Sequence, residues 1–244
     1  MNIVIPIAGE GRRFRHAGFR LPKVMLETAG KPMLYWALDS LQPLLADHRV
    51  IFVCLSRDLQ AYSLDQTILD YCPHADILGL DAPTRGQAES VWAARTILDK
   101  DEPLLIYNGD TYTKIDERSL LGFHQDDGMI PVFRSSDPAF SYVLTNGDGK
   151  VVQVREKEVI SAWATTGLYG FSRTELFLAA AEKALAEQRK ADGEYYVAPL
   201  YNDLIGQGYS FRIEPVKLCL PIGTPEQWRY FQSVIHSGKG EGGR

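Results

Sequence analysis

The chain has 244 residues, 45% of them hydrophobic, which is enough to bury a substantial core within one α/β domain. Its formal net charge of −5 argues against a general nucleic-acid binder, because phosphate contacts require a basic surface. No stretch approaches membrane-spanning length and no charged leader opens the chain, so we expect a cytoplasmic protein that binds neither nucleic acid nor membrane.

The cysteines give no sign of a disulfide framework or a zinc site. Cys54, Cys72 and Cys219 are odd in number, far apart, and lack C-x-x-C spacing. We therefore expect free thiols.

The first element predicted is a strand at 3–7, where an apolar run without charge indicates burial on both faces. Ala8, Gly9 and Gly11 follow where that strand must end, and such small residues let backbone N–H groups approach a ligand. A Walker loop would need Gly-Lys-Ser/Thr, and a dinucleotide fingerprint would need a third small residue where Phe14 stands. Neither motif is present.

Cationic side chains surround this glycine loop in the sequence. Arg12 and Arg13 follow it directly, and Lys23 comes soon after. A loop that offers N–H groups and cations together favours a polyphosphate ligand. The alternative is a tight surface turn beside a solvated basic patch.

The next elements are predicted from apolar periodicity. A helix is expected from Pro32 until Pro43 stops it, then a strand at 50–55, a helix at about 59–71 and a strand at 77–80. No acidic residue closes the strand at 50–55 to hold a ribose, which argues against a nicotinamide-dinucleotide fold.

Residues 81–86 form a predicted strand-to-helix loop at the carboxyl edge of the sheet, where ligands collect in open α/β sheets. The Asp81 carboxylate accepts hydrogen bonds, which suits the donor-bearing edge of cytosine or guanine and would favour CTP or GTP. Asp81 could equally cap the following turn.

A further buried strand is predicted at 104–107 and ends in Asn108-Gly109-Asp110. A carboxylate just past a central strand is placed to hold Mg²⁺ against phosphate oxygens, since this metal prefers hard oxygen ligands. Asp110 could also be an ordinary turn residue.

The second half contains a predicted strand at 128–133 whose Pro131 suggests an edge or a bulge, and a hairpin at 141–144 and 151–154. Thr224, Pro225 and Gln227 predict the capped start of a last helix.

Gly9-x-Gly11-x-Arg13-Phe14, with the later Pro22-Lys23, resembles the signature of the sugar-1-phosphate nucleotidyltransferases, or nucleotide-sugar pyrophosphorylases. The similarity extends from Met1 to roughly Phe231. It implies a single Rossmann-like, mostly parallel, doubly wound α/β sheet with a small strand insertion on the sugar side. The domain would span 1–237, followed by a disordered glycine-rich tail at 238–244.

The resemblance also implies roles for individual residues. Arg13 would hold the departing pyrophosphate, Lys23 the charge at the α-phosphoryl group, Lys157 the acceptor phosphate and Asp110 a Mg²⁺ ion. The other implied nucleotide-binding residues are Ala8, Gly9, Gly11, Arg12, Asp81, Gly86 and Asn108. The implied substrate-binding residues are Ser141, Glu156, Thr166, Gly167 and Glu194. Taken alone, Glu156-Lys157 would be solvated surface, and Glu194 would be explained by a helix dipole.

Two departures from the family pattern stand out. Many members carry a second metal-binding Asp where this chain has Pro221, and the usual proline after the Glu-Lys pair is Glu158. Mg²⁺ should therefore arrive with the nucleotide, whose phosphates would supply its remaining ligands.

The implied reaction joins a nucleoside triphosphate to a sugar phosphate or related phosphorylated alcohol and releases pyrophosphate, for cell-surface polysaccharide precursors. We expect a Mg²⁺-dependent monomer or small homo-oligomer. One alternative is a GT-A glycosyltransferase, although Asp110-Thr111-Tyr112 lacks the usual second carboxylate. The other is a catalytically silent nucleotide-binding subunit.

Overall fold

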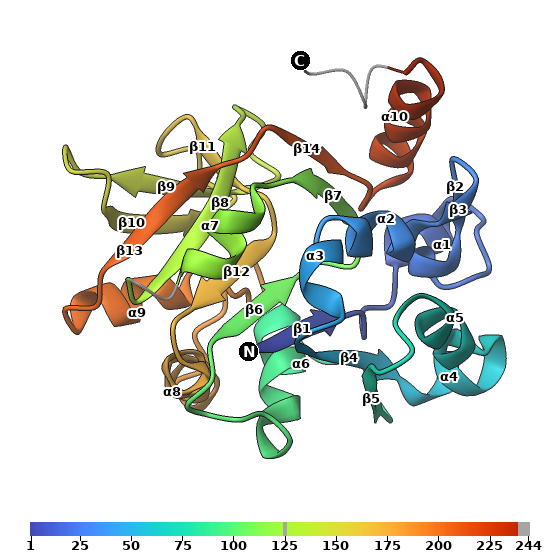
Figure 1. The fold of residues 1–244 in the computed structure, drawn as a ribbon, viewed down its shortest axis with the longest axis horizontal. Helices are drawn as coiled ribbons and strands as arrows, with labels where there is room; N and C mark the ends of the chain where they lie inside the picture. The colour runs from blue at the N-terminus through green and yellow to red at the C-terminus, as the bar shows by residue number, and fades with distance from the viewer. Residues whose placement is uncertain (124–125, 239–244) are drawn as a thin grey trace.

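The computed structural model describes residues 1–123 and 126–238. Its main sheet contains β1 (Asn2–Pro6), β4 (Arg49–Leu55), β5 (Asp76–Leu80), β6 (Leu104–Tyr107), β8 (Gly128–Arg134), β9 (Ser141–Thr145), β10 (Val151–Glu156), β11 (Trp163–Thr165), β12 (Leu168–Phe171) and β13 (Phe211–Pro215). The strand order is β10-β9-β11-β8-β12-β6-β1-β4-β5, with β13 paired to β8 (Figure 1). Two small sheets pair β14 (Leu218–Pro221) with β7 (Thr111–Lys114), and β2 (Glu27–Thr28) with β3 (Lys31–Pro32).

The strands β6-β1-β4-β5 form a parallel run, and β13 also pairs parallel with β8. Ile3, Val4 and Ile5 of β1 have no exposed surface, as expected of a strand covered on both faces. β12 then pairs antiparallel with β6, and the strands predicted as a small insertion continue the same sheet beyond it. The predicted Rossmann-like α/β fold is confirmed, and the parallel run β6-β1-β4-β5 forms one end of the sheet.

The helices are α1 (Arg12–His16), α2 (Met33–Asp39), α3 (Gln42–Leu45), α4 (Ser56–Tyr62), α5 (Leu64–Tyr71), α6 (Gln87–Ala93), α7 (Glu117–Gly122), α8 (Thr174–Ala186), α9 (Leu200–Gly206) and α10 (Pro225–His236), with 3-10 turns η1 (Lys23–Met25) and η2 (Ala94–Thr96). Successive strand residues point to opposite faces, so Val4 packs with α6, α8 and α9 while Ile3 and Ile5 pack with α2, α3, α5 and α7. The sheet is therefore covered on both faces, as predicted (Figure 1).

A third apolar cluster joins the two ends of the chain. Phe14 of α1 and Met33 of α2 pack with Leu220 of β14 and Phe231 of α10. Thr224 caps α10 by accepting a hydrogen bond from the Gln227 N–H (3.2 Å), as the sequence predicts. This cluster places β14 and α10 beside the glycine loop.

Two helix predictions are wrong in their boundaries. The helix after Pro32 ends at Asp39, and Pro43 lies in the first turn of the separate helix α3, where its fixed φ is favourable. The helix expected at 59–71 is split into α4 and α5 by Ser63, which has a left-handed φ of 52°.

Pro131 does not mark an edge strand, because β8 is paired on both sides. β8 pairs with β12 up to Met129 and with β11 from Val132, and the Pro131 carbonyl accepts a hydrogen bond from the Thr166 N–H (3.0 Å). Pro131, which has no N–H to donate, thus lies where β8 changes its pairing partner from β12 to β11.

No helix in 1–123 or 126–238 is both long and apolar enough to cross a membrane. Most of the tail predicted to be disordered, 239–244, lies outside the described residues.

Candidate active site

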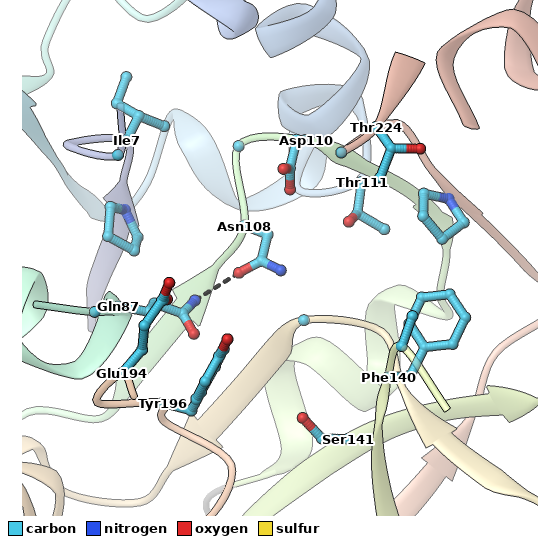
Figure 2. Close-up of a pocket in the computed structure, with 18 of the residues that line it drawn as sticks. Ile7, Gln87, Asn108, Asp110, Thr111, Phe140, Ser141, Glu194, Tyr196 and Thr224 are labelled. Carbon is cyan, nitrogen blue, oxygen red and sulfur yellow. Dashed lines mark hydrogen bonds between the residues drawn. The ribbon is translucent and has the colours of Figure 1, made fainter. Parts of the chain in front are cut away.

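A cleft of about 970 Å³ opens at the carboxyl ends of β1 and β6 and extends to the end of β10 (Figure 2). Most of the residues singled out by the sequence line it, namely Gly9, Gly11, Arg12, Arg13, Lys23, Gly86, Asn108, Asp110, Ser141, Glu156, Lys157, Thr166, Gly167 and Glu194. Residues far apart in the chain thus meet at one edge of the sheet, where open α/β folds bind ligands.

The glycine loop runs from the end of β1 to α1. Gly11 holds a left-handed φ of 61° and precedes α1, whereas Gly9 has no positive φ. Of these two glycines, Gly11 is therefore the one whose backbone conformation favours glycine. Arg12 donates a hydrogen bond to the Glu10 carboxylate (2.7 Å). Ala8 is buried beneath the loop and does not line the cleft.

Asp110 lines the cleft and contacts both Lys23 and the chain after β14. Its carboxylate forms an ion pair with the Lys23 ammonium, and the two side chains are 16% and 27% exposed. Its carbonyl accepts a hydrogen bond from the Ile222 N–H (2.8 Å). A Cβ at Gly223 would lie 2.9 Å from the Asp110 carboxylate, so glycine is needed there.

Asn108 contacts both Gln87 at the start of α6 and Gly167 between β11 and β12. Its side-chain oxygen accepts a hydrogen bond from Gln87 Nε2 (2.5 Å; dashed in Figure 2), and its N–H donates to the Gly167 carbonyl (3.1 Å). Gly167 has a φ of 83°, and a Cβ there would lie 2.3 Å from the Asn108 amide nitrogen. The sequence analysis missed Gln87, although its place directly after Gly86 was a usable signal.

Glu156 and Lys157 lie together at the end of β10. The Ser141 hydroxyl donates a hydrogen bond to the Glu156 carboxylate, and burial raises the pKa of Glu156. Lys157 adopts a left-handed φ of 55° and its ammonium pairs with Asp192. That hydrogen bond raises the pKa of Lys157 and lowers the pKa of Asp192.

The loop before α9 completes this side of the cleft and contains two residues that the sequence analysis missed. Asp192 pairs with Lys157, and the Tyr196 ring lies 5.4 Å from the Lys157 ammonium. Glu194 also lines the cleft (Figure 2). Because α9 begins only at Leu200, a helix dipole does not explain Glu194.

Gly86 lies where the loop at 81–86 meets the loop before α9. The Tyr195 N–H donates to the Arg85 carbonyl (2.9 Å), and the Ala88 N–H donates to the Tyr195 carbonyl (2.9 Å). A Cβ at Gly86 would lie 2.4 Å from the Tyr195 nitrogen, so only glycine fits. The two loops are therefore fastened by their backbones.

Asp81 lies outside the cleft. Its carboxylate accepts a hydrogen bond from the Ser56 hydroxyl (3.0 Å) and faces a neighbouring hollow that Trp92 and Arg95 also line. Asp81 is therefore not among the residues that line the cleft, and the preference for CTP or GTP stays a prediction.

Pro221 stands at the position where the family pattern described above has a second metal-binding Asp. Pro221 lines the cleft and pairs with Thr111 between β14 and β7. Among the described residues, no group of three or more His, Cys, Asp or Glu side chains is placed to hold a metal ion. A metal in this cleft would therefore need ligands from a substrate.

Comparison with solved structures gives a close match over the whole fold. A nucleoside-diphosphate-sugar pyrophosphorylase from Vibrio cholerae RC9 superposes with a TM-score of 0.83 at 30% identity, over 95% of this chain and 99% of that one.

Curated relatives match at lower identity. Bifunctional protein GlmU from Paraburkholderia phytofirmans is 27% identical over 165 residues, 65% of this chain and 34% of the relative. The catalytic subunit beta of mannose-1-phosphate guanylyltransferase from Danio rerio is 26% identical over 257 residues, 96% of this chain and 66% of the relative. The match thus spans about a third of the length of the GlmU proteins.

The family profile described as Nucleotidyl transferase matches residues 3–210, which include the glycine loop, Asp110, Glu156 and Lys157. This match covers most of the chain, and the solved structure agrees with it in fold. The chain belongs to the nucleotidyl transferase family.

Proposed function

We propose that this protein transfers a nucleotidyl group from a nucleoside triphosphate to the phosphate of a sugar phosphate, or of a related phosphorylated alcohol, and releases pyrophosphate. The observation that carries the proposal is one cleft lined by the cationic glycine loop, by Asp110 and by Glu156-Lys157. Family membership supports the reaction class, and the relatives' names support a sugar phosphate as acceptor.

In this reaction an oxygen of the acceptor phosphate attacks the α-phosphorus. The bond from that phosphorus to the oxygen bridging the β-phosphate breaks, and its electron pair leaves with pyrophosphate. Such in-line transfer depends mainly on positioning and charge neutralisation, so it needs no covalent nucleophile. Arg13 would hold the departing pyrophosphate, Lys23 the charge at the α-phosphoryl group and Lys157 the acceptor phosphate.

The acceptor would occupy the side of the cleft formed by β9, β10 and the loop before α9. Glu156 and Glu194 offer carboxylate oxygens there, and Ser141 and Thr166 offer hydroxyl groups. These groups suit a ligand rich in hydroxyl groups, because carboxylates accept and hydroxyls both donate and accept hydrogen bonds. Gly167 leaves room for the Asn108 side chain, because a Cβ there would lie 2.3 Å from the Asn108 amide nitrogen.

Asp110 fits a magnesium ion, because it is a hard oxygen donor that lines the cleft and its carboxylate already attracts a cation, the Lys23 ammonium. We propose that Asp110 holds Mg²⁺ together with oxygens of the triphosphate. The bound ion would neutralise charge on the phosphates. Because Pro221 stands where a second carboxylate would be, the protein itself supplies few ligands to the ion. This agrees with a metal that arrives with the nucleotide.

The remaining assignments are proposals of the same kind. The protein would act in the cytoplasm as a monomer or small homo-oligomer, in the synthesis of polysaccharide precursors. The Danio rerio relative is named for guanylyl transfer to mannose 1-phosphate, so GTP with that acceptor is the first pair to test.

Pyrophosphate release is the experiment that tests the proposal. The protein is incubated with Mg²⁺, each common nucleoside triphosphate and a panel of sugar phosphates. We expect release that requires both substrates in at least one combination. Nucleotide binding without release in any combination would favour the silent subunit, and nucleoside diphosphate released from a finished nucleotide sugar would favour a glycosyltransferase.

A further inference from the structure

The ion pair between Lys23 and Asp110 bears on the order in which metal and nucleotide bind. Lys23 was assigned to the nucleotide and Asp110 to the metal, yet in the free protein these two side chains bind each other. The ammonium therefore occupies the carboxylate that a divalent ion would need. A cation already stands at the proposed metal position, and it belongs to the protein.

The surroundings keep this carboxylate directed at Lys23. Gly223 leaves space for the carboxylate, because a Cβ there would lie 2.9 Å from it, and the Ile222 N–H donates a hydrogen bond to the Asp110 carbonyl (2.8 Å). Lys23 lies on η1, and its Cβ would lie 3.7 Å from a Cβ placed on Gly11. Both partners are thus attached to framework elements of the cleft.

We infer that Lys23 blocks the metal position in the free protein, so that a divalent ion reaches Asp110 only after the triphosphate has drawn the ammonium away. Ion pairs compete for a shared charge, and a polyphosphate offers Lys23 several anionic oxygens where Asp110 offers one carboxylate. Lys23 thus binds two partners one after the other, first Asp110 and then the nucleotide. This inference rests on the proposed function for Asp110 as the metal ligand and for the identity of the arriving anion.

The consequence is a binding coupling that can be measured without turnover. Coupling between two ligands typically changes each affinity by roughly 5- to 150-fold, and the change is reciprocal. Removing the ammonium should therefore strengthen metal binding to the free protein, with no nucleotide present. An effect of at least about tenfold is expected, within that range.

The test measures Mn²⁺ binding to the free full-length protein by the electron paramagnetic resonance signal of unbound Mn²⁺. Wild type should bind weakly, and Lys23→Met, which keeps an unbranched apolar stem, should bind at least about tenfold more tightly. Lys23→Gln gives a second neutral side chain in case the methionine variant does not fold. Lys23→Arg keeps the charge and should bind as weakly as wild type.

Two controls locate the effect. Lys157→Met removes a cation from the same cleft that pairs with Asp192 instead, and it should leave Mn²⁺ binding unchanged. Adding Asp110→Asn to Lys23→Met should abolish the gain. An equal gain in Lys157→Met would show a general charge effect and overturn the inference.

The inference is also wrong if the folded neutral Lys23 variants bind Mn²⁺ no more tightly than wild type. Tight binding by wild type through Asp110 would equally contradict it. Failure of the proposed function looks different: no substrate pair would release pyrophosphate, while the gain on removing the Lys23 charge would persist.

Discussion

The replacement Gly86→Ala tests how the two loops of the cleft are joined. Gly86 has φ 146° and ψ 171°, a region that is essentially restricted to glycine, and a side chain there costs about 1–3 kcal/mol. The new Cβ would also lie 2.4 Å from the Tyr195 nitrogen and 2.5 Å from its oxygen, and such overpacking costs about 1–3 kcal/mol more. The predicted loss of unfolding free energy is therefore about 2–6 kcal/mol.

For a chain of this size, each kcal/mol lowers the Tm by about 2–4 °C, so Gly86→Ala should lower it by roughly 10 °C. Differential scanning calorimetry measures the shift. Gly206→Ala is the matched control, because a Cβ at Gly206 would meet nothing within 4 Å and its φ is not left-handed. Gly86→Ala melting within about 2 °C of wild type would refute the predicted clash.

Three further predictions concern single side chains. Arg13→Ala should lower turnover at least about tenfold in the pyrophosphate assay while leaving the Tm unchanged, since Arg13 is an exposed cation on α1; unchanged turnover would remove its assigned role. Because burial raises the pKa of Glu156, ionisation of this carboxyl opposes folding as the pH rises, so Glu156→Gln should raise the Tm at pH 8 and gain little at pH 4; melting curves at both values decide. Asp81→Asn should leave the ranking of nucleoside triphosphates by kcat/KM unchanged, because Asp81 binds Ser56 outside the cleft, and an altered ranking would show that Asp81 reaches the base.

The parts of the fold that could be predicted are those with a strong local pattern. β1, β6 and the part of β4 after Arg49 are runs without charge, and such runs indicate strands covered on both faces. The Gly11 turn and the Thr224 cap follow from residue types with a specific backbone or hydrogen-bonding use. The helix break at Ser63 has no glycine or proline to announce it, so periodicity alone misses it.

The site was predictable where a motif carried it and not where it depends on tertiary contacts. Asp192 meets Lys157 across 35 residues, and Gln87 meets Asn108 across 21. A lone Asp or Gln in a loop gives no sign of such a partner. Asp81 lies near the carboxyl edge as predicted, but its side chain accepts a hydrogen bond from Ser56, and its contact with a base stays a prediction.

The fate of labelled phosphate tests the central claim most directly. The protein is given a nucleoside triphosphate labelled at the α-phosphate or, separately, at the γ-phosphate, together with a sugar phosphate and Mg²⁺. Nucleotidyl transfer predicts that the α label appears in a nucleotide-linked sugar and the γ label in pyrophosphate, in equal amounts. Transfer of the γ label to the acceptor, or release of the γ label as inorganic phosphate without a nucleotide-linked product, would contradict the account.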